Sequence, residues 1–107
     1  MRLMRLIVLF DLPTGNKEER KSYTEFRNFL LNDGYTMLQF SVYSRVAALS
    51  RDTAETHLRR LKNNLPAVGK VTALLITEAQ FENREVLVNT NPLPYPMALD
   101  AQMTLGF

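Results

Sequence analysis

Two helical patterns, each flanked by β-type segments, limit the folds open to this chain more than any other feature. An apolar run over residues 3–12 predicts a buried strand, because it is short and continuous. Helical spacing follows over residues 16–33, and a long β-type stretch occupies residues 35–46. A second helical pattern over residues 52–65 precedes a strand at 70–77. The order is therefore β-α-β-β-α-β.

The first helix carries recognisable start and stop signals. Asn16 is an expected N-cap, and Glu19 stands three positions later, where it completes a capping box. Gly34 suits the left-handed position that often ends a helix. A buried stripe at helical spacing is expected to comprise Tyr23, Phe26 and Leu30.

The remaining elements are less sharply marked. Residues 35–46 are expected to form either two strands with a break near Gln39 or one strongly bent strand. Asp52 is the expected N-cap of the second helix, and residues 84–88 are expected to form a short final strand.

This order predicts an α+β fold: a ferredoxin-like β-α-β-β-α-β sandwich with a short extra C-terminal strand. Both helices would cover one face of the sheet, and the opposite face would be bare. We expect an apolar set on that face, and dimerisation through it, from Tyr35, Met37, Phe40, Val42 and Tyr43.

The domain is expected to span residues 1–88, with a Pro-rich tail over 89–107. Residues 1–70 hold 12 of the 13 Lys and Arg but 7 of the 11 Asp and Glu, so the body is basic and the end acidic. This distribution permits a phosphate-facing surface, although a mixed solvated surface explains it equally well. The chain has no Cys and no long apolar span, so we expect a cytoplasmic protein without a membrane segment.

Few residues of this sequence are candidates for catalysis or metal binding. The single histidine, His57, lies beside the apolar stripe of the second helix and is expected to be structural. Asp11 is the exception, because it is a carboxylate at the C-terminal end of the first strand, where sites tend to form. The alternative is that Asp11 only caps the following turn through the amides of Thr14 or Gly15.

One carboxylate holds Mg²⁺ weakly, and phosphodiester hydrolysis usually needs two carboxylates or two metal ions. In a twofold dimer, Asp11 from each subunit could face its mate across the axis. A metal site of this kind would exist only in the dimer.

Several segments resemble a known family. They are Leu9-Phe10-Asp11-Leu12-Pro13, the helix with Arg20, Tyr23, Phe26 and Arg27, then Gly34-Tyr35, Met37 to Tyr43 (MLQFSVY), Asn64-Leu65-Pro66, Gly69-Lys70-Val71 and Ile76 to Phe81 (ITEAQF). Together they resemble the small CRISPR-associated endoribonuclease of the spacer-acquisition module, most of all the version in type II systems. The resemblance runs from about residue 4 to 88.

The resemblance implies a ferredoxin-like homodimer in which the end strand of one subunit extends the sheet of its mate. It implies a role in spacer acquisition, in which the dimer bridges the CRISPR integrase and binds duplex DNA. It also implies a Mg²⁺-dependent nuclease activity on RNA or DNA, present in some members and absent in others, with Asp11 from both subunits as the catalytic metal ligand.

By the same analogy, Phe10, Phe40 and Ser41 neighbour the metal site. Candidate nucleic-acid contacts are Arg20, Arg27, Arg45 and Arg59. Core packing explains Phe10 and Phe40 without any function, and solvated helix charges explain Arg20 and Arg27.

Two features depart from the family pattern. Thr24 and Thr72 occupy positions where relatives often carry Arg, and the tail, through which relatives contact the integrase, has no match. Three hypotheses follow: a scaffold that binds duplex DNA, which we favour; a Mg²⁺ nuclease acting on RNA or DNA; and a toxin-like ribonuclease of the same fold that needs no integrase. The expected nucleic-acid partners are duplex DNA, single-stranded RNA or both.

Overall fold

The computed structural model describes residues 3–47 and 51–90. Seven elements follow one another along the chain: β1 (Met4–Asp11), α1 (Lys17–Asn32), β2 (Thr36–Gln39), β3 (Val42–Val46), α2 (Arg51–Lys62), β4 (Lys70–Thr77) and α3 (Glu78–Glu82). The predicted tail lies almost wholly in residues 91–107, outside the described residues.

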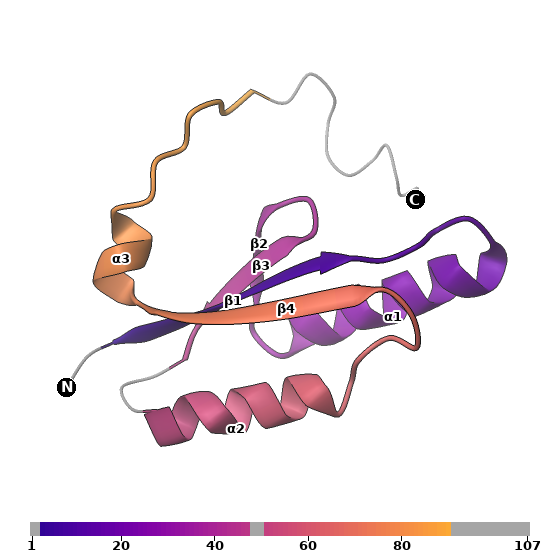
Figure 1. The fold of residues 1–107 in the computed structure, drawn as a ribbon, viewed down its shortest axis with the longest axis horizontal. Coiled ribbons are helices and arrows are strands. Elements are labelled where there is room, and N and C mark those ends of the chain that lie inside the picture. Colours follow the sequence, from indigo (N-terminus) through magenta and orange to yellow (C-terminus); the bar gives the residue numbers. More distant parts are fainter. Residues whose placement is uncertain (1–2, 48–50, 91–107) are drawn as a thin grey trace.

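The four strands form one antiparallel sheet in the order β2-β3-β1-β4, which is the ferredoxin-like topology predicted from the sequence. β1 is therefore a central strand with neighbours on both sides. It pairs with β4 along its whole length, from Met4 opposite Thr77 to Asp11 opposite Lys70. Figure 1 shows α1 and α2 on one side of this sheet and α3 on the other.

The core lies between the sheet and the two long helices. Alternate residues of β1 face the helices, because successive side chains of a strand point to opposite faces. The buried side chains of this core are Leu6, Val8 and Phe10 from β1, Phe26 and Leu30 from α1, Tyr35 before β2, Tyr43 from β3, Ala47 after β3, and Ala54 and Leu61 from α2. The predicted stripe of α1 is confirmed, with Tyr23 partly buried beside it.

The predicted N-cap of helix α1 is confirmed, but the predicted capping box is not closed, because Glu19 binds the Gly15 amide in place of the Asn16 amide. The Asn16 side chain accepts a hydrogen bond from the Glu19 amide at 2.8 Å, and the Glu19 carboxylate accepts one from the Gly15 amide at 2.8 Å. Gly34 follows the helix with φ +94°, the left-handed conformation that glycine adopts easily. Helix α2 begins at Arg51, so Asp52 lies within the helix and not at its N-cap.

The long β-type stretch is two strands, and Gln39 ends the first of them. The prediction of a bare apolar face over this stretch was wrong for Tyr35 and Tyr43, which are buried in the core. A register irregularity between Met37 and Gln39 shifts the alternation, so simple counting along the chain misplaces the two faces. Phe40 is exposed at the tip of the hairpin.

The predicted strand at 84–88 is replaced by helix α3 and a following segment without regular structure. Thr77 and Gln80 form a reciprocal capping box that starts this helix, with hydrogen bonds of 2.9 and 3.1 Å. Their spacing was the available sequence signal. No strand of the described chain lies beside Val86, Leu87 and Val88, so their backbone has no ladder to join.

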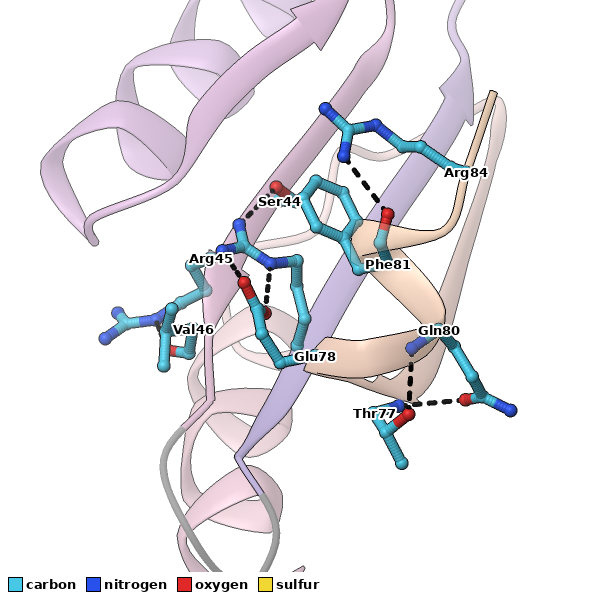
Figure 2. Close-up of polar contacts among 9 residues, drawn as sticks. Ser44, Arg45, Val46, Thr77, Glu78, Gln80, Phe81 and Arg84 are labelled. Atoms are coloured by element: carbon cyan, nitrogen blue, oxygen red, sulfur yellow. Dashed lines mark hydrogen bonds and ion pairs between the residues drawn. The ribbon is translucent and has the colours of Figure 1, made fainter. Parts of the chain in front are cut away.

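A cluster of side chains holds α3 against the sheet (Figure 2). Arg5 of β1 donates to both carboxylate oxygens of Glu78, at 2.7 and 2.9 Å, and to the hydroxyl of buried Ser44 at 3.1 Å. The Phe81 ring lies between two guanidinium groups, with the Arg5 and Arg84 Cζ atoms 4.0 and 3.8 Å from its centroid. We call these five residues the α3 clasp. The clasp covers one end of the sheet face that α1 and α2 leave open.

Among the described residues, no helix is long and apolar enough to cross a membrane.

Candidate metal and nucleic-acid site

Asp11 is the last residue of central strand β1, and its side chain is exposed. Its neighbour Phe10 faces the core, so the alternation of the strand directs Asp11 to the open face of the sheet. Lys70 stands directly opposite in β4, on the same face. Within the described residues Asp11 makes no ion pair, and its carboxylate is therefore accessible to a ligand.

The loop before β4 fixes the backbone of this strand end. Gly69 has φ +109°, and a Cβ built there would lie 2.8 Å from the carbonyl oxygen of Asp11 and 2.6 Å from Cδ2 of Leu12. Only glycine permits both this conformation and this approach. The close approach of Gly69 in the α2–β4 loop thus fixes the backbone of Asp11.

Asp11 offers one carboxylate, which is a donor type that Mg²⁺ prefers. No group of three or more His, Cys, Asp or Glu side chains suited to a metal occurs among the described residues. The described part of one chain therefore offers a single carboxylate at this strand end. A complete set requires a second carboxylate from outside this chain or oxygens from a bound phosphate.

The residues predicted to neighbour Asp11 do lie at this end of the sheet. The amide of Phe10 donates to the carbonyl oxygen of Ser41 at 3.1 Å, which joins the β2–β3 hairpin to the strand end. The Phe10 ring is buried and packs edge-on against Phe26, with centroids 5.2 Å apart. The role of Phe10 in packing is thus established, whereas Phe40 remains available to solvent.

The predicted basic residues differ in what they contact. Arg20 is exposed on α1 and donates to the carbonyl oxygen of Thr14 at 3.3 Å. Arg27, further along α1, is partly buried, and its charge opposes the rise that burial causes in the pKa of Tyr43. Arg59 is exposed on α2. All three are carried by the two long helices.

Arg45 is held differently, on the side of β3 that faces the helices. It donates to the carbonyl oxygen of Asp33, and its guanidinium lies 4.0 Å from the Asp33 carboxylate. Arg60, which the sequence did not single out, binds the same carboxylate at 2.9 and 3.3 Å. Arg45 therefore ties the end of α1 to the sheet.

His57 completes this group, and the prediction that it is structural agrees with its surroundings. Its Nδ1 atom lies 2.6 Å from a guanidinium nitrogen of Arg60, so Nδ1 accepts a hydrogen bond. Desolvation lowers the pKa of His57, and the charges of Arg45 and Arg60 lower it further. The imidazole is consequently neutral at pH 7 and serves as an acceptor within a cationic cluster.

Comparisons with known proteins cover most of the chain. A family profile described as CRISPR associated protein Cas2 matches residues 4–84. A CRISPR-associated endoribonuclease Cas2 of Acidovorax ebreus is 52% identical over 85 residues, which cover 79% of this chain and 82% of that protein. One of Flavobacterium psychrophilum is 45% identical over 92 residues, covering 86% and 79%.

A solved structure agrees in fold. The crystal structure of Streptococcus pyogenes Cas2 at pH 6.5 superposes with a TM-score of 0.57 and 16% sequence identity, covering 78% of this chain and 99% of that one. The sequence matches extend over most of the domain that carries Asp11, and the resemblance seen in the sequence is confirmed. This chain belongs to the Cas2 family of CRISPR-associated proteins.

Proposed function

We propose that this CRISPR-associated chain works in spacer acquisition as a homodimer that binds nucleic acid and bridges the CRISPR integrase, with Asp11 from both subunits forming a Mg²⁺ site. The observation that carries the proposal is the accessible carboxylate of Asp11 at the end of the central strand, which belongs to no metal-binding group among residues 3–47 and 51–90. A second copy would supply the second carboxylate.

Two surfaces support a dimer. The sheet face opposite α1 and α2 is covered only in part by the α3 clasp, and Leu74 of β4 is exposed there. The segment after α3 exposes three consecutive apolar side chains, of which Leu87 is 84% exposed. An apolar β-type segment without a strand partner can gain both hydrogen bonds and burial by pairing with another chain.

Nucleic acid would bind through phosphates. Arg20 and Arg59 are exposed guanidinium groups on α1 and α2, and such groups contact phosphate oxygens without reading sequence. Lys70, opposite Asp11, adds a cation beside the proposed metal site. These contacts would place a phosphodiester near the carboxylate.

A bound Mg²⁺ would polarise a phosphoryl oxygen and make a coordinated water more acidic. The residues of this chain would hold the metal ion and orient the nucleic-acid substrate. Asp11 is fixed at the end of a paired strand, and Gly69 keeps the backbone behind it in place. Lys70 and the arginines of the helices would position the phosphate chain.

Cleavage of labelled single-stranded RNA and duplex DNA, with Mg²⁺ or with EDTA, tests the metal site. Asp11→Asn, which keeps the size of the side chain, should abolish any Mg²⁺-dependent cleavage. Glu18→Gln, at an exposed acid of α1, is the matched control and should cleave normally. Equal cleavage by wild type and Asp11→Asn would exclude the metal role of Asp11.

Spacer acquisition in cells tests the scaffold separately. Charge reversal at Arg20 or Arg59 should reduce acquisition, while Asp11→Asn should leave it intact if the scaffold acts without cleavage. A chain that supports no acquisition with its integrase, yet is toxic when expressed alone, would point instead to an independent ribonuclease.

A further inference from the structure

Phe40 is the one aromatic side chain among residues 3–47 and 51–90 that is more than a third exposed. It is 44% exposed, whereas the other described aromatic rings are buried or half-buried. A phenylalanine left in water loses the burial that normally stabilises the fold. Its exposure at the tip of the β2–β3 hairpin therefore calls for a physical explanation.

The Phe40 ring is backed by a second ring. Tyr23 of α1 stacks against it, with centroids 6.0 Å apart and ring planes 23° apart. Tyr23 in turn meets the buried ring of Phe10, with centroids 6.0 Å apart. This aromatic row runs outward from the residue that precedes Asp11, and it ends at an exposed ring that is supported from within.

The backbone beside Phe40 is strained. Ser41 has φ +67°, the only positive φ at a non-glycine residue in the described chain. Such conformations cost roughly 1–3 kcal/mol and occur often where a ligand is bound. The hydrogen bond from the Phe10 amide to the Ser41 carbonyl oxygen, at 3.1 Å, fixes this strained tip to the end of β1.

Cationic side chains flank Tyr23, the ring that supports Phe40, along helix α1. Arg20 and Arg27 stand three positions before and four positions after Tyr23, so all three lie on one face of α1. Arg27 is near enough to Tyr23 to oppose the rise that burial causes in the pKa of this tyrosine. An exposed ring supported by Tyr23, with two arginines beside that tyrosine on the same helix face, suits a nucleotide, which has a flat base and an anionic phosphate.

We propose that Phe40, supported by Tyr23, is a stacking platform for an unpaired nucleobase, and that Arg20 and Arg27 bind the phosphates beside it. The proposal rests on the proposed function, since it requires that the chain binds nucleic acid. It adds a base contact to the phosphate contacts already proposed, because an unpaired base is offered by single-stranded RNA or DNA and not by the interior of a duplex. Phe40 and Asp11 would then act on the same strand at one end of the sheet.

The test measures binding without metal, so it does not depend on cleavage. Single-stranded RNA and single-stranded DNA, each carrying one 2-aminopurine, are titrated with the full-length protein in EDTA, beside a duplex of the same sequence. Phe40→Tyr keeps the ring, Phe40→Leu keeps apolar bulk without it, and Phe40→Ala removes both. Leu31→Ala, at an exposed apolar residue of α1, is the matched control.

Stacking quenches the fluorescence of 2-aminopurine, so wild type and Phe40→Tyr should quench it while Phe40→Leu and Phe40→Ala should not. The alanine change should weaken single-strand binding roughly tenfold, in line with the loss of one base–aromatic stack. The salt dependence of binding should stay the same, because no phosphate contact is removed. Whichever of the RNA and DNA arms shows the larger loss identifies the preferred strand.

Undiminished quenching with Phe40→Leu, in a variant whose melting curve matches wild type, would overturn the proposal and leave the scaffold function standing. A change in oligomeric mass with Phe40→Ala, without a change in base quenching, would assign the ring to a protein contact and overturn it as well. If wild type bound no nucleic acid at all, the platform and the proposed function would fail together.

Discussion

The guanidinium of Arg5 donates two hydrogen bonds to the carboxylate of Glu78, from Nε to Oε1 at 2.7 Å and from Nη2 to Oε2 at 2.9 Å, and the two residues are 73 positions apart in the sequence. This pair fastens α3 to the first strand. Because the chain leaves α3 toward Val86, Leu87 and Val88, the pair also sets the direction in which that apolar segment departs.

Acid should release this attachment. The pKa of Glu78 lies below its ordinary value of 4.5, chiefly because its carboxylate accepts hydrogen bonds from Arg5. The unfolded chain lacks this restraint and so binds a proton first as the pH falls. The contribution of the pair is therefore complete above about pH 4.5 and declines as the pH falls through the lower pKa of the folded state.

Melting temperatures of wild type and Glu78→Gln, measured from about pH 7 to about pH 3, check this expectation. The variant should melt lower near pH 7, and the gap should narrow in acid. Glu25→Gln, at an exposed residue of α1, should show no such narrowing. A gap that stayed constant across the range would mean that the charge of Glu78 contributes nothing.

Gly69→Ala should destabilise the fold by about 2 kcal/mol, because it combines a strained φ with a clash. The added methyl group would meet backbone and side-chain atoms of Asp11 and Leu12 at under 3 Å. Gly15→Ala is the matched control, since its nearest neighbour would be the flexible Glu19 carboxylate at 3.3 Å. Urea unfolding gives both values, and equal stabilities would contradict the tight approach.

Arg45→Ala and Arg59→Ala should separate structure from binding. Loss of Arg45 breaks its contacts with Asp33 and should cost about 1–3 kcal/mol of stability. Loss of exposed Arg59 should change stability by less than about 0.5 kcal/mol. It should instead reduce the slope of log affinity against log salt by about 1, as for one lost phosphate contact. Melting curves measure the stability of the two variants, and gel shifts at several salt concentrations measure their binding. If Arg59→Ala lost stability and Arg45→Ala changed only the salt slope, the two roles would be exchanged.

Leu87→Asp should convert the proposed dimer into a monomer. Leu87 is 84% exposed in the single chain, so the substitution should leave the fold intact and act only on association. Val68→Asp, at a residue 54% exposed before β4, is the control and should remain dimeric. Light scattering after size-exclusion chromatography measures the mass, and a dimer with Leu87→Asp would exclude this segment from the interface.

The elements that follow a clear periodicity could be predicted from the sequence. The two long helices and the four sheet strands, together with the Asn16 cap, arise from local patterns of apolar and capping residues. The position of Asp11 at a strand end likewise follows from the local sequence. These patterns carry the fold.

Relations between distant residues could not be predicted in the same way. Alternation separates the two faces of a strand without saying which one is covered, so Tyr35 and Tyr43 were assigned to the wrong face. The Arg5–Glu78 pair and the shared binding of Asp33 by Arg45 and Arg60 depend on the assembled fold. The strand expected at 84–88 needs a neighbouring strand, which the described part of this chain does not provide.

The central place of β1 has a consequence for the dynamics of the candidate site. Fraying of a sheet starts at its edges, here β2 and β4, and the amides of an inner strand exchange with solvent last. The backbone of β1 up to Phe10, the residue before Asp11, should therefore stay fixed while loops and edges fluctuate. Any regulation of this carboxylate has to come from what assembles around it, because loosening its own strand would require opening the sheet.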